Sequence, residues 1–293
     1  MVTVGRSVKI GVAASLMSLF VFNAYWTSKS YENLFGYLFH VQPGYDYVNM
    51  LGLVFWTGHI GLTARFAAIT LGLIAVFLLW AKAWTFLKVK NLVATALFLE
   101  GVNFLGLLPS TWWMLRVESF VYSPALGAGY LLQVLFTTPL LWSLAVKVMR
   151  YDGKRSTGSL WKWAAFAFVG YMVALLANEV SRWMSMISLD NIQFLMQGIR
   201  AVGFFNAVVI MPLAVVFAVA GAVFLINHNR VCAIKWLGAS LATAGLHYTV
   251  FIIYSYFANS LNYAPLVDIW TAPLLGLGIA MLINVLQNRP SKH

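Results

Sequence analysis

The sequence has very few charged residues and almost no cysteine. Only 9% of its 293 residues are charged, and eight of them are acidic, whereas about a quarter of the residues in a soluble domain carry charge. This composition excludes a soluble globular enzyme. Cys232 is the only cysteine, which excludes an intrachain disulfide and a cysteine metal cluster. No Walker or dinucleotide-binding fingerprint is present either, so nucleotide-dependent chemistry is not indicated.

Hydrophobic residues are abundant instead, at 61% of the chain with a mean hydropathy of +0.82. A helix needs about 20 apolar residues to cross the hydrocarbon core of a bilayer. Eight such runs predict an all-α polytopic membrane protein, a single bundle over residues 1–293. They lie near residues 8–26, 64–82, 91–112, 126–147, 160–182, 204–227, 236–257 and 268–287. The first run lacks a small-x-small cleavage site, so we expect it to be retained rather than removed as a signal peptide.

The basic residues follow these runs in a regular way. Fourteen of the nineteen lie in the two terminal segments and at the connections after the second, fourth and sixth runs, together with a single acid, Asp152. Cytoplasmic loops carry such an excess of Lys and Arg. The net charge of +11 therefore indicates orientation in a cell membrane, with both termini cytoplasmic and the bilayer as partner, rather than binding to nucleic acid.

The segments on the opposite side are not ordinary hydrophilic loops. Residues 27–63 and 184–203 mix aromatic residues and glycine with isolated polar groups. Tyr and Trp favour the headgroup region of a bilayer. We therefore expect amphipathic segments on the outer face, where an aromatic belt is the simplest interpretation and a sugar- or lipid-binding surface is the alternative.

Glu100 is the most deeply placed acid of the predicted bundle. It follows Lys90 by ten residues, or about 15 Å of helix, and Asn103 follows on the same face. His247 comes twelve residues after Lys235, which predicts a similar depth, so these two side chains could meet. Burial favours a protonated carboxyl, as a proton relay needs. A satisfied core histidine is the simpler interpretation of His247.

A second polar group lies toward the outer margin of the fifth run. Asn178 and Glu179 are followed by Arg182, and a spacing of three puts Glu179 and Arg182 on one face of a helix. Charges in hydrocarbon cost several kcal/mol and are usually paired. The sequence leaves two alternatives open, a structural ion pair and a site for a solute or ion.

Glu179 and Arg182 are superficially similar to the glutamate motif of CAAX-processing membrane proteases. That family has two adjacent glutamates before the arginine and further histidines, whereas Asn178 precedes Glu179 here and His247 is the only histidine available in the later predicted spans. The protease activity is therefore not carried over. No spacing typical of a metal site is present, and no cofactor is indicated.

Three functions fit these observations. The first is a transporter or channel-like carrier of a small solute or ion, with an outward-facing polar cavity and Glu100 as its deepest titratable group. The second is a non-catalytic subunit of a larger membrane complex, for example of a respiratory or oxidase type, or a homo-oligomer. The third is a membrane enzyme acting on a lipid-linked substrate, although no nucleophile and base are recognisable as a pair. The sequence therefore favours the two non-enzymatic functions and leaves the membrane enzyme as an alternative.

Overall fold

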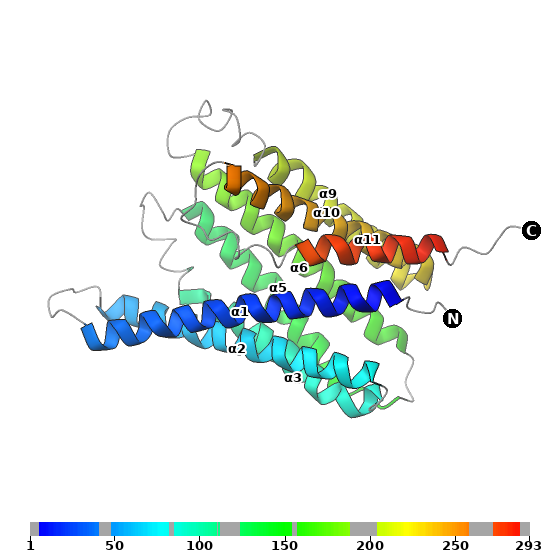
Figure 1. The fold of residues 1–293 in the computed structure, drawn as a ribbon, viewed down its shortest axis with the longest axis horizontal. Coiled ribbons are helices and arrows are strands. Elements are labelled where there is room, and N and C mark those ends of the chain that lie inside the picture. Colours follow the sequence, from blue (N-terminus) through cyan, green and yellow to red (C-terminus); the bar gives the residue numbers. More distant parts are fainter. Residues whose placement is uncertain are drawn as a thin grey trace, which may run out of the picture.

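The computed structural model describes residues 6–40, 48–81, 85–109, 111, 124–153, 157–187, 204–257 and 272–287. Within these ranges all regular structure is helical, which confirms the all-α class. The helices are α1 (Arg6–His40), α2 (Val48–Trp80), α3 (Phe86–Leu105), α5 (Pro124–Met149), α6 (Thr157–Ile187), the π-helical turn η1 (Asn206–Ile210) with α9 (Met211–Ile226), α10 (Arg230–Phe257) and α11 (Ala272–Gln287) (Figure 1).

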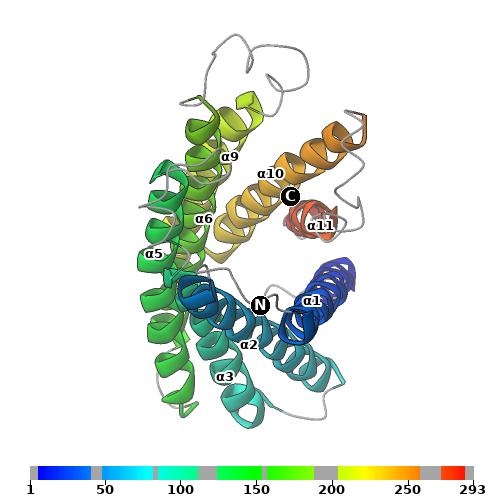
Figure 2. The same ribbon diagram turned by 90° about the vertical axis from the view of Figure 1, so that its left-hand side faces the viewer.

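These helices are arranged as a closed ring (Figure 2). Each helix packs against its neighbours in the chain, and α11 returns to pack against α1. Small residues let the backbones approach closely. A Cβ atom added to Gly11 of α1 would lie 3.2 Å from the Cα atom of Leu277 in α11, and one added to Gly238 of α10 would lie 3.2 Å from the carbonyl oxygen of Gly278 in α11. These close approaches place α11 against both α1 and α10 and so close the ring.

Among the described residues, five helices are long and apolar enough to cross a membrane. The qualifying stretches are Val8–Tyr25, Trp56–Trp80, Gly127–Met149, Ser159–Ala177 and Ala207–Ile226. They fall on the first, second, fourth, fifth and sixth predicted spans, whereas the other three predicted spans fall on α3, α10 and α11. A chain with five such helices has the features of a membrane protein.

The first two predicted spans were expected to be joined by a separate outer segment, residues 27–63. This prediction is wrong for the part of that segment that the structure describes. Residues 27–40 continue α1, and residues 48–63 form the first half of α2. The two helices stay paired there, since the Tyr31 and Thr63 hydroxyls lie 2.8 Å apart and the Tyr31 ring meets His59 edge-on at 5.7 Å. Apolar and aromatic residues at helical spacing let both helices run beyond the thickness of hydrocarbon. In the other expected segment, residues 188–203 lie outside the described part.

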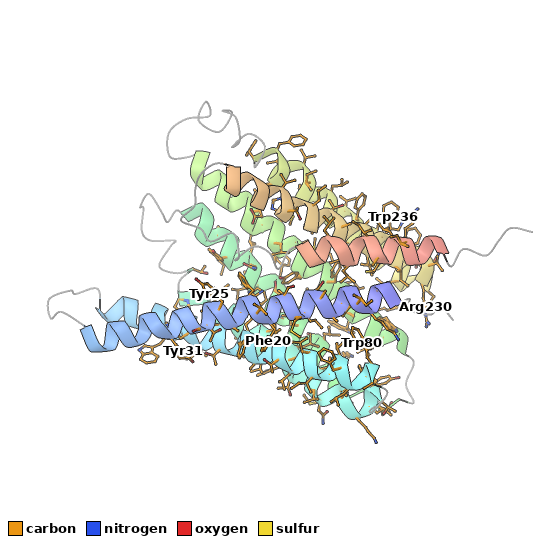
Figure 3. All side chains as sticks on the ribbon, viewed as in Figure 1. Phe20, Tyr25, Tyr31, Trp80, Arg230 and Trp236 are labelled. Carbon is orange, nitrogen blue, oxygen red and sulfur yellow. The ribbon has the colours of Figure 1, made fainter. Side chains whose placement is uncertain are left out.

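One end of the ring is basic, as the charge distribution predicted. The last turns of α2, α5 and α9 and the first turns of α3, α6 and α10 lie at the same end as the beginning of α1 and the end of α11 (Figures 1 and 3). We call this the basic end. Among the described residues it contains one acid, Asp152, and the cations Arg6, Lys9, Lys88, Lys90, Lys147, Arg150, Lys162, Arg230 and Lys235.

Lys90 ties two helices together at the basic end. Its Nζ donates to the carbonyl oxygens of Met149 and Tyr151, at 2.9 and 2.6 Å. The last carbonyl groups of a helix have no intrahelical partner and attract a cation. The Phe86 ring also meets Tyr151 at 5.6 Å. The charge of Lys90 is thus committed to holding the start of α3 against the end of α5.

Candidate functional site

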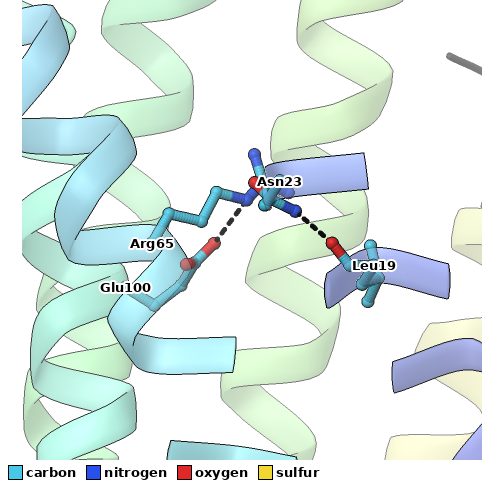
Figure 4. Close-up of polar contacts among 4 residues, drawn as sticks. All are labelled: Leu19, Asn23, Arg65 and Glu100. Atoms are coloured by element: carbon cyan, nitrogen blue, oxygen red, sulfur yellow. Dashed lines mark hydrogen bonds and ion pairs between the residues drawn. The ribbon is translucent and has the colours of Figure 1, made fainter. Parts of the chain in front are cut away.

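The carboxylate of Glu100 faces an arginine on the neighbouring helix. Oε1 of Glu100 in α3 lies 3.7 Å from Nε of Arg65 in α2, and the two side chains are 22% and 25% exposed (Figure 4). Arg65 lies within the membrane-compatible stretch Trp56–Trp80. Since α2 begins at Val48, the arginine is far from either helix end.

Two buried asparagines lie on the helices near this ion pair. Asn23 of α1 is 1% exposed, donates from Nδ2 to the carbonyl oxygen of Leu19 at 2.7 Å and points toward the Arg65 guanidinium (Figure 4). Asn103, one turn beyond Glu100, is also buried. A Cβ atom added to Gly61 would lie 3.2 Å from the Asn103 carbonyl oxygen and 3.5 Å from its Oδ1. The predicted residues Glu100 and Asn103 therefore lie at the contact between α2 and α3.

The second ion pair joins α6 to α10. Oε2 of Glu179 lies 3.8 Å from Nε2 of His247, and the side chains are 8% and 3% exposed. This pair is more deeply buried than that of Glu100 and Arg65. The structure thus brings together two predicted site residues that the sequence had placed at different depths.

The expected meeting of Glu100 with His247 is replaced by a different pairing. His247 lies against Glu179, and Glu100 lies against Arg65. The expectation counted residues from lysines at the helix ends and treated those lysines as level with one another. The helices of the ring are visibly inclined to each other (Figure 1), and lysine side chains extend toward the interface from different heights. Equal residue counts therefore do not give equal depths.

Asn178 and Arg182 lie in α6 with Glu179. Their side chains lie outside the described part of the structure, so a contact between Glu179 and Arg182 stays a prediction. The helical backbone keeps Arg182 on the same face as Glu179, one turn away. His247 is thus the described residue that is placed to compensate the Glu179 carboxylate.

Tyr171 of α6 lies near the pair of Glu100 and Arg65, and the sequence analysis did not identify it. It lies within electrostatic range of both Arg65 and Glu100, and its ring meets Phe104 of α3 edge-on at 6.2 Å. Glu179 comes eight residues later on the same side of α6, about 12 Å further along the axis. The sequence signal that could have identified Tyr171 was its position about two helical turns before Glu179.

These contacts define an interior polar strip on four helices. It consists of Arg65 and Glu100 at one level and Glu179 and His247 at another, with Tyr171 of α6 near the first pair. Among the described residues there is no group of three or more His, Cys, Asp or Glu that could hold a metal ion. Comparisons with protein-family models, curated proteins and solved structures found no match for this chain.

Proposed function

We propose that the protein carries a small ion, most simply the proton, across a membrane along the interior polar strip. The observation that carries this proposal is the presence of two acid–base pairs inside a ring of largely apolar helices. Ionisable residues within membrane segments are costly, and they commonly mark ion pathways and proton relays. For stability alone, apolar side chains of similar volume would serve as well as a buried ion pair.

The chemistry of the strip fits stepwise proton transfer. Glu100 and Glu179 can each accept a proton, His247 can release one, and the Tyr171 hydroxyl can both donate and accept a hydrogen bond. Arg65 stays protonated at every accessible pH, so its charge favours the Glu100 carboxylate. Protonation of Glu100 removes this attraction and would let α2 and α3 separate locally. Glu100 is therefore the group that couples proton binding to movement of helices.

Proton movement into liposomes containing the purified protein tests this proposal. With a pH-sensitive dye inside and a potassium diffusion potential across the membrane, we expect acidification several times faster than in protein-free liposomes. Glu100→Gln should reduce the rate to that of protein-free liposomes. Asp152→Asn, which removes an exposed carboxylate at the basic end, is the matched control and should leave the rate unchanged. Equal rates for Glu100→Gln and the unmodified protein would refute the role of Glu100.

We further propose that all eight helical segments span the membrane and that the basic end is cytoplasmic. The excess of cations over the single acid Asp152 at that end supports this orientation. In a protein whose Cys232 has been replaced by Ser, Ser28→Cys should react with an impermeant thiol reagent in intact cells. Ser156→Cys should react only after the cells are opened. The reverse pattern would show the opposite orientation.

A non-catalytic subunit of a larger membrane complex is the second candidate. Large apolar side chains are exposed along α9, including Leu213, Val216, Val219 and Val223. Such a face is suited to lipid and equally to a helix of another subunit. Purification in a mild detergent distinguishes the two functions, because a subunit should retain a partner in fixed stoichiometry and show no proton movement by itself.

A further inference from the structure

A lysine at the basic end is held at the boundary between two helices. Nζ of Lys147, in the last turn of α5, lies 5.7 Å from the ring centroid of Trp163 in α6. A cation is attracted to an aromatic face at this distance. The contact is between helices, unlike that of Lys235 with Trp236, which are neighbours in sequence with the same 5.7 Å separation. Lys147 therefore marks a position defined by the tertiary structure.

Two further cations flank the contact between Lys147 and Trp163 in the sequence. Arg150 follows Lys147 by three residues, directly after the end of α5, and Lys162 directly precedes Trp163 in α6. All three cations are exposed. Within the described part of the chain, none of them forms an ion pair with a carboxylate, and Asp152 is the only acid nearby. The junction of α5 and α6 thus carries a concentrated positive charge.

Apolar side chains are exposed just beside these cations. Val146 and Met149 on α5 are 43% and 54% exposed, and Trp161 and Phe166 on α6 are 51% and 47% exposed. Tryptophan side chains favour the headgroup level of a bilayer. An apolar surface that adjoins a basic cluster matches a ligand with an anionic head and an apolar tail.

We propose that the junction of α5 and α6 at the basic end is a binding site for an anionic phospholipid. Its phosphate would lie among Lys147, Arg150 and Lys162, and an acyl chain would lie along Val146 and Phe166. Basic sites between membrane helices bind anionic headgroups in this manner. The exposed apolar side chains favour a lipid over a nucleic acid or a soluble phosphate compound. The site lies outside the interior polar strip, so it does not depend on the transport proposal.

Lipid binding to the purified protein in a mild detergent tests the proposal. The probes are dioleoyl phosphatidylglycerol and, as the uncharged comparison, dioleoyl phosphatidylcholine, with bound lipids counted by native mass spectrometry. The site variant combines Lys147→Gln, Arg150→Gln and Lys162→Gln. The control variant combines Lys9→Gln, Lys88→Gln and Arg230→Gln, which removes the same charge from exposed cations elsewhere at the basic end.

We expect the site variant to bind the first phosphatidylglycerol about tenfold or more weakly, since each cation near an anionic headgroup contributes to affinity. The control variant should bind it nearly as well as the unmodified protein. Equal weakening in both variants would mean diffuse attraction and would overturn the site, as would equal affinity for phosphatidylcholine. Displacement of the lipid by glycerol 3-phosphate alone would show a phosphate site rather than a lipid site. Lys147→Gln alone, at an exposed position, should reproduce part of the loss if the triple variant does not fold.

Discussion

Glu100→Gln is expected to lower the free energy of unfolding by about 3 kcal/mol, as the removal of one partner from a buried ion pair commonly does. The loss of stability comes from Arg65, which remains without its partner. Arg65 cannot lose its proton, and it lies in a stretch apolar enough to cross a membrane. Without the carboxylate at 3.7 Å, the guanidinium charge stays in that environment incompletely compensated. Thermal unfolding in detergent, with Asp152→Asn as the control, measures the loss.

A double variant shows whether Glu100 and Arg65 stabilise the protein as an interacting pair or independently of each other. Replacing Arg65 by Met together with Glu100→Gln removes both charges, so the double variant should be less destabilised than the sum of the single variants. Additive losses would show that the two residues do not interact. A nearly neutral Glu100→Gln would instead indicate that the carboxyl is already protonated, as expected for a buried acid without a cation beside it. The protonated carboxyl stretch in the infrared spectrum distinguishes these states directly.

The helices were predictable because hydrophobic runs and charge distribution are local properties of the sequence. The run near residues 126–147 corresponds closely to α5 (Pro124–Met149), and the run near 204–227 corresponds to η1 with α9. The bounds of a helix were less predictable where no charged residue or helix breaker follows the hydrophobic run. Residues 27–40 continue α1 well past the first predicted span, because packing against α2 stabilises helix beyond the hydrocarbon.

The pairing of the polar residues was only partly predictable. Spacing within one helix shows which face a residue occupies, and residue counts placed Glu100 and His247 deep in the bundle and Glu179 at its outer margin. In the structure, Glu179 and His247 are both buried. The partner depends on which helices are neighbours in the ring and on how they are inclined. Arg65 was therefore missed as the partner of Glu100, because His247 was the only residue of another span that had been considered. No pattern within a single span could reveal a contact between α2 and α3.

The partner of Glu179 can be identified by a comparison of two double-mutant cycles. One cycle combines Glu179→Gln with His247→Gln, and the other combines Glu179→Gln with Arg182→Gln. The 3.8 Å separation and the nearly complete burial of Glu179 and His247 predict a coupling energy of about 1 to 3 kcal/mol between them, in the range found for residues in contact. The helical spacing of three predicts a smaller coupling with Arg182.

The two cations also differ in how they respond to the loss of the carboxylate. After Glu179→Gln, His247 can become neutral by releasing a proton, whereas Arg182 cannot. The loss of stability from Glu179→Gln should therefore be smaller than that from Glu100→Gln if His247 is the principal partner. If Arg182 is the principal partner, the two losses should be similar and the Arg182 cycle should show the larger coupling energy. Additivity in both cycles would contradict any ion pair at Glu179 and would leave the Glu100–Arg65 pair as the polar centre of the ring.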